Sequence, residues 1–285
     1  MTPAALSSHL QPGINGLPRL LLSAPDGARA EIYAHGAHLT SWIPAGEEER
    51  LFLSSRSTFD HHSAIRGGVP VIFPQFGDEG PLPKHGFARL MEWELLSLET
   101  SAAGASARFG IQDDPASRQV WPDAFACELS VTLAGQVLEM ALSVFNPGPR
   151  AFSFTGGLHT YLRVRDIGSA SLEGLGGAAY LDTVGTRTER IQPETGLTFQ
   201  SEVDRIYHTA PDRLLLREPD RTLAIETSGF GQVVVWNPWV EKSAGLNDME
   251  AEGFRRMLCV EAAAAGSPVT VQPGQRWTGL QRLRA

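Results

Sequence analysis

The chain has 285 residues, of which 42% are hydrophobic and 20% charged, so it can bury a sizeable core and form one domain. Its 32 acidic and 24 basic side chains give a net charge of -8 and are scattered along the sequence. No basic stripe of the kind that neutralises nucleic-acid phosphates is present, so we expect no nucleic-acid partner.

Cysteine usage and the N-terminal sequence indicate the cellular compartment. The two cysteines, Cys127 and Cys259, lie in apolar strand-like runs and are too few to cross-link a secreted chain. The first residues lack a basic region followed by an apolar stretch, and no run approaches the roughly 18 apolar residues that a membrane helix needs. We therefore expect reduced cysteines in a cytoplasmic protein without a membrane partner.

Short apolar segments separated by glycine and proline run through the whole sequence. There are 29 glycines and 19 prolines, a spacing typical of many antiparallel strands rather than of alternating strands and helices. The expected strands cover 28–34, 38–43, 105–111, 125–133, 137–145, 150–164, 214–216, 222–227, 233–236, 257–262 and 269–271. No long amphipathic helix is evident, although residues 248–256 suit a helical turn or two. We expect an all-β fold, a large antiparallel β-sandwich with few short helices.

The connections between these runs indicate a single domain. The segment Ala134-Gly135-Gln136 joins two of the expected strands and suits a hairpin. No internal repeat, low-complexity tract or linker divides the chain. We expect residues 25–285 to form one domain, with residues 1–24 as an N-terminal extension or first strand.

Two stretches interrupt the strand pattern. Residues 63–89, SAIRGGVPVIFPQFGDEGPLPKHGFAR, are too rich in glycine and proline for regular sheet and too apolar for disorder. They predict a long, shaped loop, and loops of that length are usually functional. Residues 237–253 lie between two expected strands, and we expect them to wrap an edge or rim of the site.

Two ionisable side chains occur in otherwise strand-like runs. His159 lies at the centre of the polar face of 150–164, after glycines that would let a ligand approach the backbone. Taken alone, such a histidine is more often a hydrogen-bonded structural residue. Glu261 is the single carboxylate in the apolar run 257–263, where burial without a partner costs several kcal/mol. It is therefore kept either for a structural ion pair or for a function.

The loop at residues 63–89 also carries a histidine and two arginines, His85, Arg66 and Arg89. Together they can surround a phosphate with charge-assisted and partly bidentate hydrogen bonds. The alternative is that Arg66 and Arg89 brace the loop against Asp78 or Glu79.

Other histidines and aromatic residues have simpler interpretations. The pairs His61-His62 and His35 with His38 lack the accompanying ligands of a zinc site, and the two cysteines are far apart in sequence, so we expect no metal. Trp236, Trp239 and Tyr161 could stack on a sugar, although core packing is the commoner use of such side chains.

Five ordered motifs carry a stronger signal together than any one residue does. The segments RGGVPVIFPQFG, KHGFAR, GGLHTYLRV, VVVWNPW and CVEAA, in this order, resemble those of the hexose-6-phosphate mutarotases, or glucose-6-phosphate 1-epimerases, a branch of the galactose mutarotase-like superfamily. The resemblance extends from about residue 35 to the C-terminus. It implies the superfamily's supersandwich fold and interconversion of the α and β anomers of a hexose 6-phosphate, most simply glucose 6-phosphate, without a cofactor. The expected partner is the small sugar phosphate, and we expect a monomer.

The resemblance also assigns roles in the reaction. His159 in GGLHTYL would be the general acid and Glu261 in CVEAA the general base for opening and closing the pyranose ring. His85 in KHGFAR would bind sugar hydroxyls or share the acid role.

Four further positions would bind the substrate. Arg66, Gln75 and Arg89 would line the pocket, with the arginines holding the phosphate. Asp204 would bind sugar hydroxyls, although its motif is the loosest match and a surface-turn aspartate is the alternative.

Three other functions are compatible with parts of this pattern. An aldose 1-epimerase acting on non-phosphorylated sugars would share the acid and the base but would not need Arg66 and Arg89. A non-catalytic sugar-phosphate-binding protein would keep the fold and the pocket, yet both His159 and Glu261 are intact here. A glycoside-cleaving enzyme would require two carboxylates beside the scissile bond, and only Glu261 is a candidate.

Overall fold

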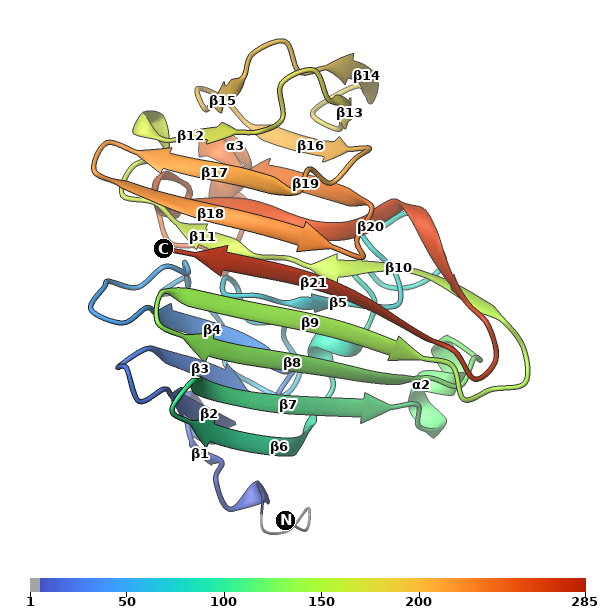
Figure 1. The fold of residues 1–285 in the computed structure, drawn as a ribbon. Helices are drawn as coiled ribbons and strands as arrows, with labels where there is room; N and C mark the ends of the chain where they lie inside the picture. The colour runs from blue at the N-terminus through green and yellow to red at the C-terminus, as the bar shows by residue number, and fades with distance from the viewer. Residues whose placement is uncertain (1–5) are drawn as a thin grey trace.

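The computed structural model describes residues 6–285 and consists mainly of three antiparallel sheets (Figure 1). The nine-stranded sheet has the order β15 (Gly196–Thr198), β12 (Ser171–Glu173), β17 (Arg213–Glu218), β18 (Arg221–Ser228), β21 (Arg276–Arg284), β9 (Val137–Phe145), β8 (Ala126–Ala134), β7 (Gly104–Gln112) and β6 (Glu94–Ser101). The eight-stranded sheet has the order β14 (Thr188–Ile191), β13 (Ala179–Asp182), β16 (Val203–Tyr207), β19 (Gln232–Asn237), β20 (Met257–Val271), β10 (Phe152–Leu158) and β5 (Val71–Ile72), with β11 (Tyr161–Arg163) also paired to β20. The four-stranded sheet has the order β1 (Gln11–Pro12), β2 (Pro18–Ser23), β3 (Arg29–Tyr33) and β4 (His38–Ile43).

Helices are short and connect the strands. The α-helices α2 and α3 span Pro115–Val120 and Trp239–Ala244, and the 3-10 helices η1 to η4 span Ile14–Gly16, Ala88–Leu90, Ile167–Ser169 and Gly253–Arg256. Within residues 6–285, no helix has the length and apolar character that a membrane crossing requires.

The two large sheets face each other across a continuous apolar core. Strands β8 and β9 alternate buried and more exposed residues, as period-two strands with one face on a core do. Inside the sandwich, the Gln281 amide on β21 donates to the Val260 carbonyl on β20, and its oxygen accepts a hydrogen bond from the Thr160 hydroxyl. This buried contact ties the middle of one sheet to the middle of the other.

The expected all-β sandwich is confirmed, and most of its expected strands are present with small shifts at their ends. The expected run 150–164 is interrupted at His159 and Thr160, where the Thr160 N–H turns back to the Leu158 carbonyl. The runs 257–262 and 269–271 are parts of one continuous strand, β20. Strands β1 and β2 lie within residues 1–24, where an extension or a first strand was expected. Strands β6, β12 to β16 and β21 were not expected, because charged, polar or glycine residues dilute their apolar pattern.

The loop at residues 63–89 is ordered by pairing with the sheet and by buried side chains. Within it, β5 pairs with β10, and Phe73 packs against Phe154 with ring centroids 5.2 Å apart. The Nε2 atom of His35 bonds to the Ser63 carbonyl at 2.9 Å, and that of His38 bonds to the Gly67 carbonyl at 2.7 Å. Both histidines therefore help to hold the loop in place.

Residues 237–253 form α3 and the turns that follow it. Lys242, Leu246 and Asp248 of this segment line the cavity described below, in the rim position expected from the sequence. The helical turn expected within 248–256 is present as η4.

Candidate active site

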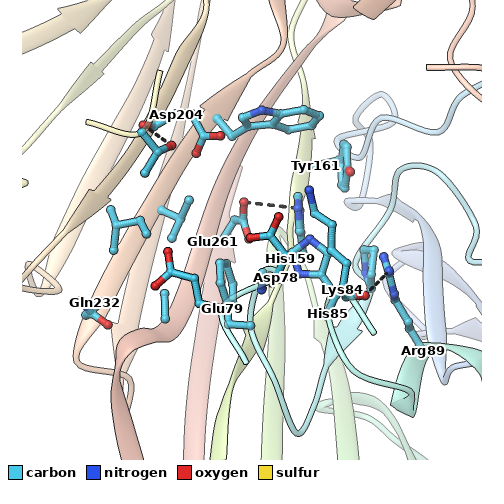
Figure 2. A pocket seen from close by; sticks show the side chains of 18 of the residues that line it. Asp78, Glu79, Lys84, His85, Arg89, His159, Tyr161, Asp204, Gln232 and Glu261 are labelled. Atoms are coloured by element: carbon cyan, nitrogen blue, oxygen red, sulfur yellow. Dashed lines mark hydrogen bonds and ion pairs between the residues drawn. The ribbon is translucent and has the colours of Figure 1, made fainter. Parts of the chain in front are cut away.

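A cavity of about 810 Å³ opens between the loop at residues 63–89 and the eight-stranded sheet (Figure 2). Strands β11, β16, β19 and β20 form one wall, the loop forms the other, and α3 with the following turn closes one side. Ionisable side chains from both walls reach this space, so the cavity combines groups that can move protons with groups that can hold a charged ligand.

Glu261 lies in the middle of β20, opposite Val234 of β19, and only 1% of its surface is exposed. Burial raises the pKa of its carboxyl well above the usual range, and the negative charge of Asp204 adds to the increase. Its Oε2 atom has no hydrogen-bond partner among the described residues. A buried carboxylate with a free oxygen is costly in the empty protein, and a ligand that donates to it would recover that cost.

His159 lies between β10 and β11, and its side chain faces Glu261 on β20. Its Nε2 atom is 3.4 Å from Glu261 Oε1, and its ring stacks on Tyr161 with centroids 4.8 Å apart and planes at 11°. Burial lowers the pKa of His159 well below its usual range, and His85, Arg66 and Arg89 lower it further. Because burial disfavours a net charge on the pair, the stable state has no net charge. The carboxyl and the imidazole then hold one exchangeable proton between them.

His85 presents one ring nitrogen to the cavity in a defined protonation state. Its Nδ1 atom accepts a hydrogen bond from the Gly77 N–H at 3.2 Å, and its ring lies edge-on to His159 with centroids 5.4 Å apart. Burial, Arg89 and Lys84 lower the pKa of His85 to about 3. The neutral ring therefore carries its proton on Nε2 and can donate it to a ligand.

Three cations line the loop side of the cavity. Arg66 is paired with Asp248 at 3.0 Å and donates to the Tyr161 hydroxyl at 2.9 Å. Arg89 donates to the Lys84 carbonyl at 2.7 Å. Neither Arg89 nor Lys84 makes an ion pair with any carboxylate within residues 6–285. Two positive charges are thus available to an anionic ligand.

These partners differ from those of the alternative considered for the two arginines. Neither Arg66 nor Arg89 is paired with Asp78 or Glu79, and Glu79 instead forms an ion pair with Arg187. The loop is braced mainly by its backbone hydrogen bonds and by the histidines beneath it.

Asp204 and Gln75 differ in how they relate to the cavity. Asp204 lies on β16, lines the cavity and is 3.5 Å from Lys242, so it is not a surface-turn residue. Gln75 is buried but does not line the cavity, because its amide bonds to the Gly77 and Leu82 carbonyls and accepts from the Leu82 N–H. The structure uses Gln75 to shape the loop.

Lys84 and Asp248 also line the cavity and were not singled out from the sequence. Lys84 immediately precedes His85 in the KHGFAR segment, and that adjacency was the available signal. Its side chain lines the cavity from the loop, as His85 does (Figure 2). Asp248 had no comparable signal, because its role depends on contact with Arg66 from a distant part of the chain.

Comparison with known proteins shows the family of enzymes to which this chain belongs. Residues 18–284 match the aldose 1-epimerase family, and the chain belongs to that family. A protein of Cenchrus ciliaris, provisionally named glucose-6-phosphate 1-epimerase, is 35% identical over 281 residues, covering 95% of this chain and 85% of its own length. An Escherichia coli protein with the same provisional name is 36% identical over 241 residues, covering 83% and 80% of the two chains.

Solved structures give the same result for the fold. A crystal structure from Salmonella typhimurium, described provisionally as a mutarotase, superposes with a TM-score of 0.90 at 30% identity and covers 98% of this chain and 94% of its own. The galactose mutarotase-like sandwich expected from the motifs is therefore the fold of this protein.

Proposed function

We propose that this enzyme interconverts the α and β anomers of a hexose 6-phosphate, with glucose 6-phosphate as the first candidate. Relatives that bear the name glucose-6-phosphate 1-epimerase cover most of the chain. The observation that carries the choice of a phosphorylated sugar is the pair of cations, Lys84 and Arg89, that line the cavity without an ion-pair partner among the described residues. A free sugar offers no charge to match them.

Ring opening requires a base at the anomeric hydroxyl and an acid at the ring oxygen. These two oxygens are bonded to the same carbon, so both lie within reach of a pair whose atoms are 3.4 Å apart. Glu261 removes the proton of the anomeric hydroxyl while His159 delivers one to the ring oxygen. This step uses the form of the pair in which His159 carries the exchangeable proton and Glu261 is a carboxylate. After ring opening the pair still holds one such proton, now the sugar's proton on Glu261, and His159 is neutral.

Ring closure reverses these steps after the aldehyde has turned. Rotation about the bond between C1 and C2 presents the other face of the carbonyl to the attacking hydroxyl. The same two groups then exchange protons in the opposite direction, so the enzyme ends the cycle with its proton where it began. His85 donates from Nε2 to a sugar oxygen, and Asp204 accepts from sugar hydroxyls.

The phosphate is held on the loop side of the cavity. Arg89 and Lys84 provide charge that is not neutralised by protein carboxylates, while Arg66 is held in place by Asp248 and Tyr161. Charge-assisted hydrogen bonds from such groups are roughly twice as strong as neutral ones, so they can offset the negative charge of the whole chain.

Magnetisation-transfer NMR on purified protein tests this function directly. Exchange between the α and β signals is measured for glucose 6-phosphate and for glucose at the same enzyme concentration. Acceleration of the phosphate ester well above that of the free sugar is the expected result. Equal acceleration of both sugars would instead assign the enzyme to non-phosphorylated aldoses, and no acceleration of either would refute the mutarotase function.

A further inference from the structure

Cys259 is a buried thiol beside the acid–base pair, and the proposed sugar chemistry gives it no role. It lies two residues before Glu261 on β20, so the two side chains project from the same face of the strand. It is fully buried and pairs in register with Tyr161, the residue on which His159 stacks. This position brings the sulfur atom of Cys259 close to both His159 and Glu261.

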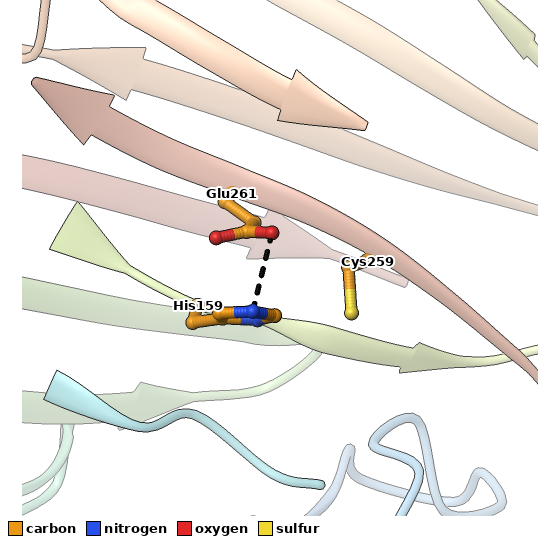
Figure 3. A group of neighbouring side chains, drawn as sticks. All are labelled: His159, Cys259 and Glu261. Atoms are coloured by element: carbon orange, nitrogen blue, oxygen red, sulfur yellow. Dashed lines mark ion pairs between the residues drawn. The ribbon is translucent and has the colours of Figure 1, made fainter. Parts of the chain in front are cut away.

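The three side chains converge closely enough to share one ion. Each residue offers one ligand atom, and the atoms from His159, Cys259 and Glu261 all lie within 4.8 Å of one another (Figure 3). No other cluster of three or more histidine, cysteine, aspartate or glutamate residues with this spacing occurs within residues 6–285. All three residues are buried, so they form a shielded cluster rather than a patch of surface acids.

The geometry of this cluster is close to that of a tetrahedral zinc site. Nitrogen and oxygen ligands at about 2.0–2.2 Å from zinc, at tetrahedral angles, lie roughly 3.4 Å apart. The observed separation of His159 Nε2 and Glu261 Oε1 is 3.4 Å. The sulfur of Cys259 needs to approach by at most about 1 Å to complete three ligands, leaving a fourth position toward the cavity.

The electrostatic setting of Glu261 also favours a cation. Its Oε2 atom is buried without a hydrogen-bond partner among the described residues, and no lysine or arginine forms an ion pair with it. The combination of imidazole, thiolate and carboxylate matches the ligands of Zn²⁺ and excludes Mg²⁺ and Ca²⁺, which require oxygen ligands throughout.

One feature limits the affinity of the cluster for zinc. The Nδ1 atom of His159 is buried and has no acceptor among the described residues. Zinc-binding histidines almost always donate this second N–H to a carboxylate, a carbonyl or water, which raises their affinity for the metal. We therefore expect the cluster to bind zinc reversibly, in competition with substrate, and not to hold it as a permanent cofactor.

We propose that His159, Cys259 and Glu261 form an inhibitory Zn²⁺ site. The ion displaces the thiol proton of Cys259 and the proton shared by the pair, both of which pass to solvent. It then occupies the two groups that transfer protons, and its open position faces the space that the sugar would enter. Zinc and sugar phosphate are consequently mutually exclusive, and the inhibition arm of this proposal rests on the proposed function.

Direct binding tests the site without reference to activity. Chelator-treated protein is titrated with Zn²⁺ against a chromophoric chelator, and with Co²⁺ while thiolate-to-cobalt absorption is followed. One equivalent is expected to bind wild-type protein with the absorption of a sulfur ligand. Because loss of an outer-shell partner alone weakens metal sites by about 10- to 100-fold, C259A should raise the Kd for Zn²⁺ at least about tenfold.

The chain offers a matched control for this substitution. Cys127 is also buried within a strand, in the nine-stranded sheet, and its replacement leaves a cavity of similar size. C127A should keep the wild-type Kd and the cobalt absorption, and C259S, which keeps the shape of the side chain but replaces the sulfur, should lose that absorption. Equal Kd values for C259A, C127A and wild type, or binding without sulfur absorption, would overturn the site.

Inhibition is measured by anomer exchange at buffered free Zn²⁺, with each variant compared with its own metal-free rate. Raising the concentration of glucose 6-phosphate should relieve inhibition of the wild type, and C259A should need at least about tenfold more zinc. Cys259-dependent zinc binding by a protein without exchange activity would refute the proposed function but keep the site. Exchange activity without Cys259-dependent zinc binding would refute the zinc site but keep the proposed function.

Discussion

The two walls of the cavity are built differently, although both carry ionisable groups. On the sheet side, Glu261 and Asp204 lie within strands whose backbone is held by continuous hydrogen-bonded ladders. On the loop side, Lys84 and Arg89 lie in a glycine- and proline-rich segment that histidines anchor from beneath. Proton transfer tolerates little displacement, whereas a phosphate can be held by several adaptable cations. We infer that the sheet performs the chemistry and the loop selects the substrate.

The largest effect is expected from replacing the acid or the base on the sheet side. E261Q and H159N should each reduce kcat by about 10²- to 10⁴-fold for every sugar that the enzyme accepts, because each removes a proton-transfer group. The measurement is the NMR exchange rate at saturating sugar, corrected for the spontaneous rate. A normal kcat in either variant would show that the sheet wall does not carry the chemistry.

A smaller and more selective effect is expected on the loop side. R89A and K84A should each raise KM for glucose 6-phosphate by about 10- to 100-fold, since a hydrogen bond to a charged group contributes about 1.5–3 kcal/mol. The KM for glucose should change little. R276A, which removes an exposed arginine on β21 outside the cavity, serves as the control. Equal changes in KM for both sugars would show that these cations do not bind the phosphate.

The anchoring of the loop should make stability depend on pH. Burial lowers the pKa of His38 from the model-compound value of 6.5 to about 3. Its stabilising contribution is complete above pH 6.5 and is lost as the pH falls toward 3, because the unfolded chain binds a proton that the folded chain excludes. Urea unfolding between pH 6 and pH 4 should therefore show a decrease of about 1.4 kcal/mol per pH unit from this residue.

The variant H38Q isolates that contribution. Glutamine keeps an N–H group that can donate toward the Gly67 carbonyl but does not titrate. Its unfolding free energy should fall less steeply with acid than that of the wild type, by about the stated slope. Identical slopes for the two proteins would mean that His38 is not excluded from protonation in the fold.

The smallest effect is expected where the loop meets the opposite rim. Glu79 of the loop and Arg187, between β13 and β14, form an exposed ion pair beside the cavity. Exposed pairs contribute about 0–1 kcal/mol, so E79Q should change KM by less than about fivefold, and less still at high salt. A change as large as that of R89A would show that the pair holds the loop in its binding position.

Much of the sheet and part of the site could be predicted from local patterns. Alternation along residues 125–145 indicates β8 and β9 and their buried faces, because a period of two leaves one face for the core. Glu261 is conspicuous as a carboxylate in an apolar strand, and His159 as a histidine after two glycines. These signals depend only on neighbours in the chain, so they are legible before any tertiary contact is known.

Other features depend on residues far apart in the sequence, and only the folded chain decides them. Gln75 and Lys84 lie in one loop, yet its backbone course satisfies the amide of Gln75 internally and leaves the cation of Lys84 in the cavity. The 3.4 Å contact between His159 and Glu261 depends on β11 pairing with β20. Which strands pair is set by burial over the whole core, so no local pattern states which distant side chains will meet.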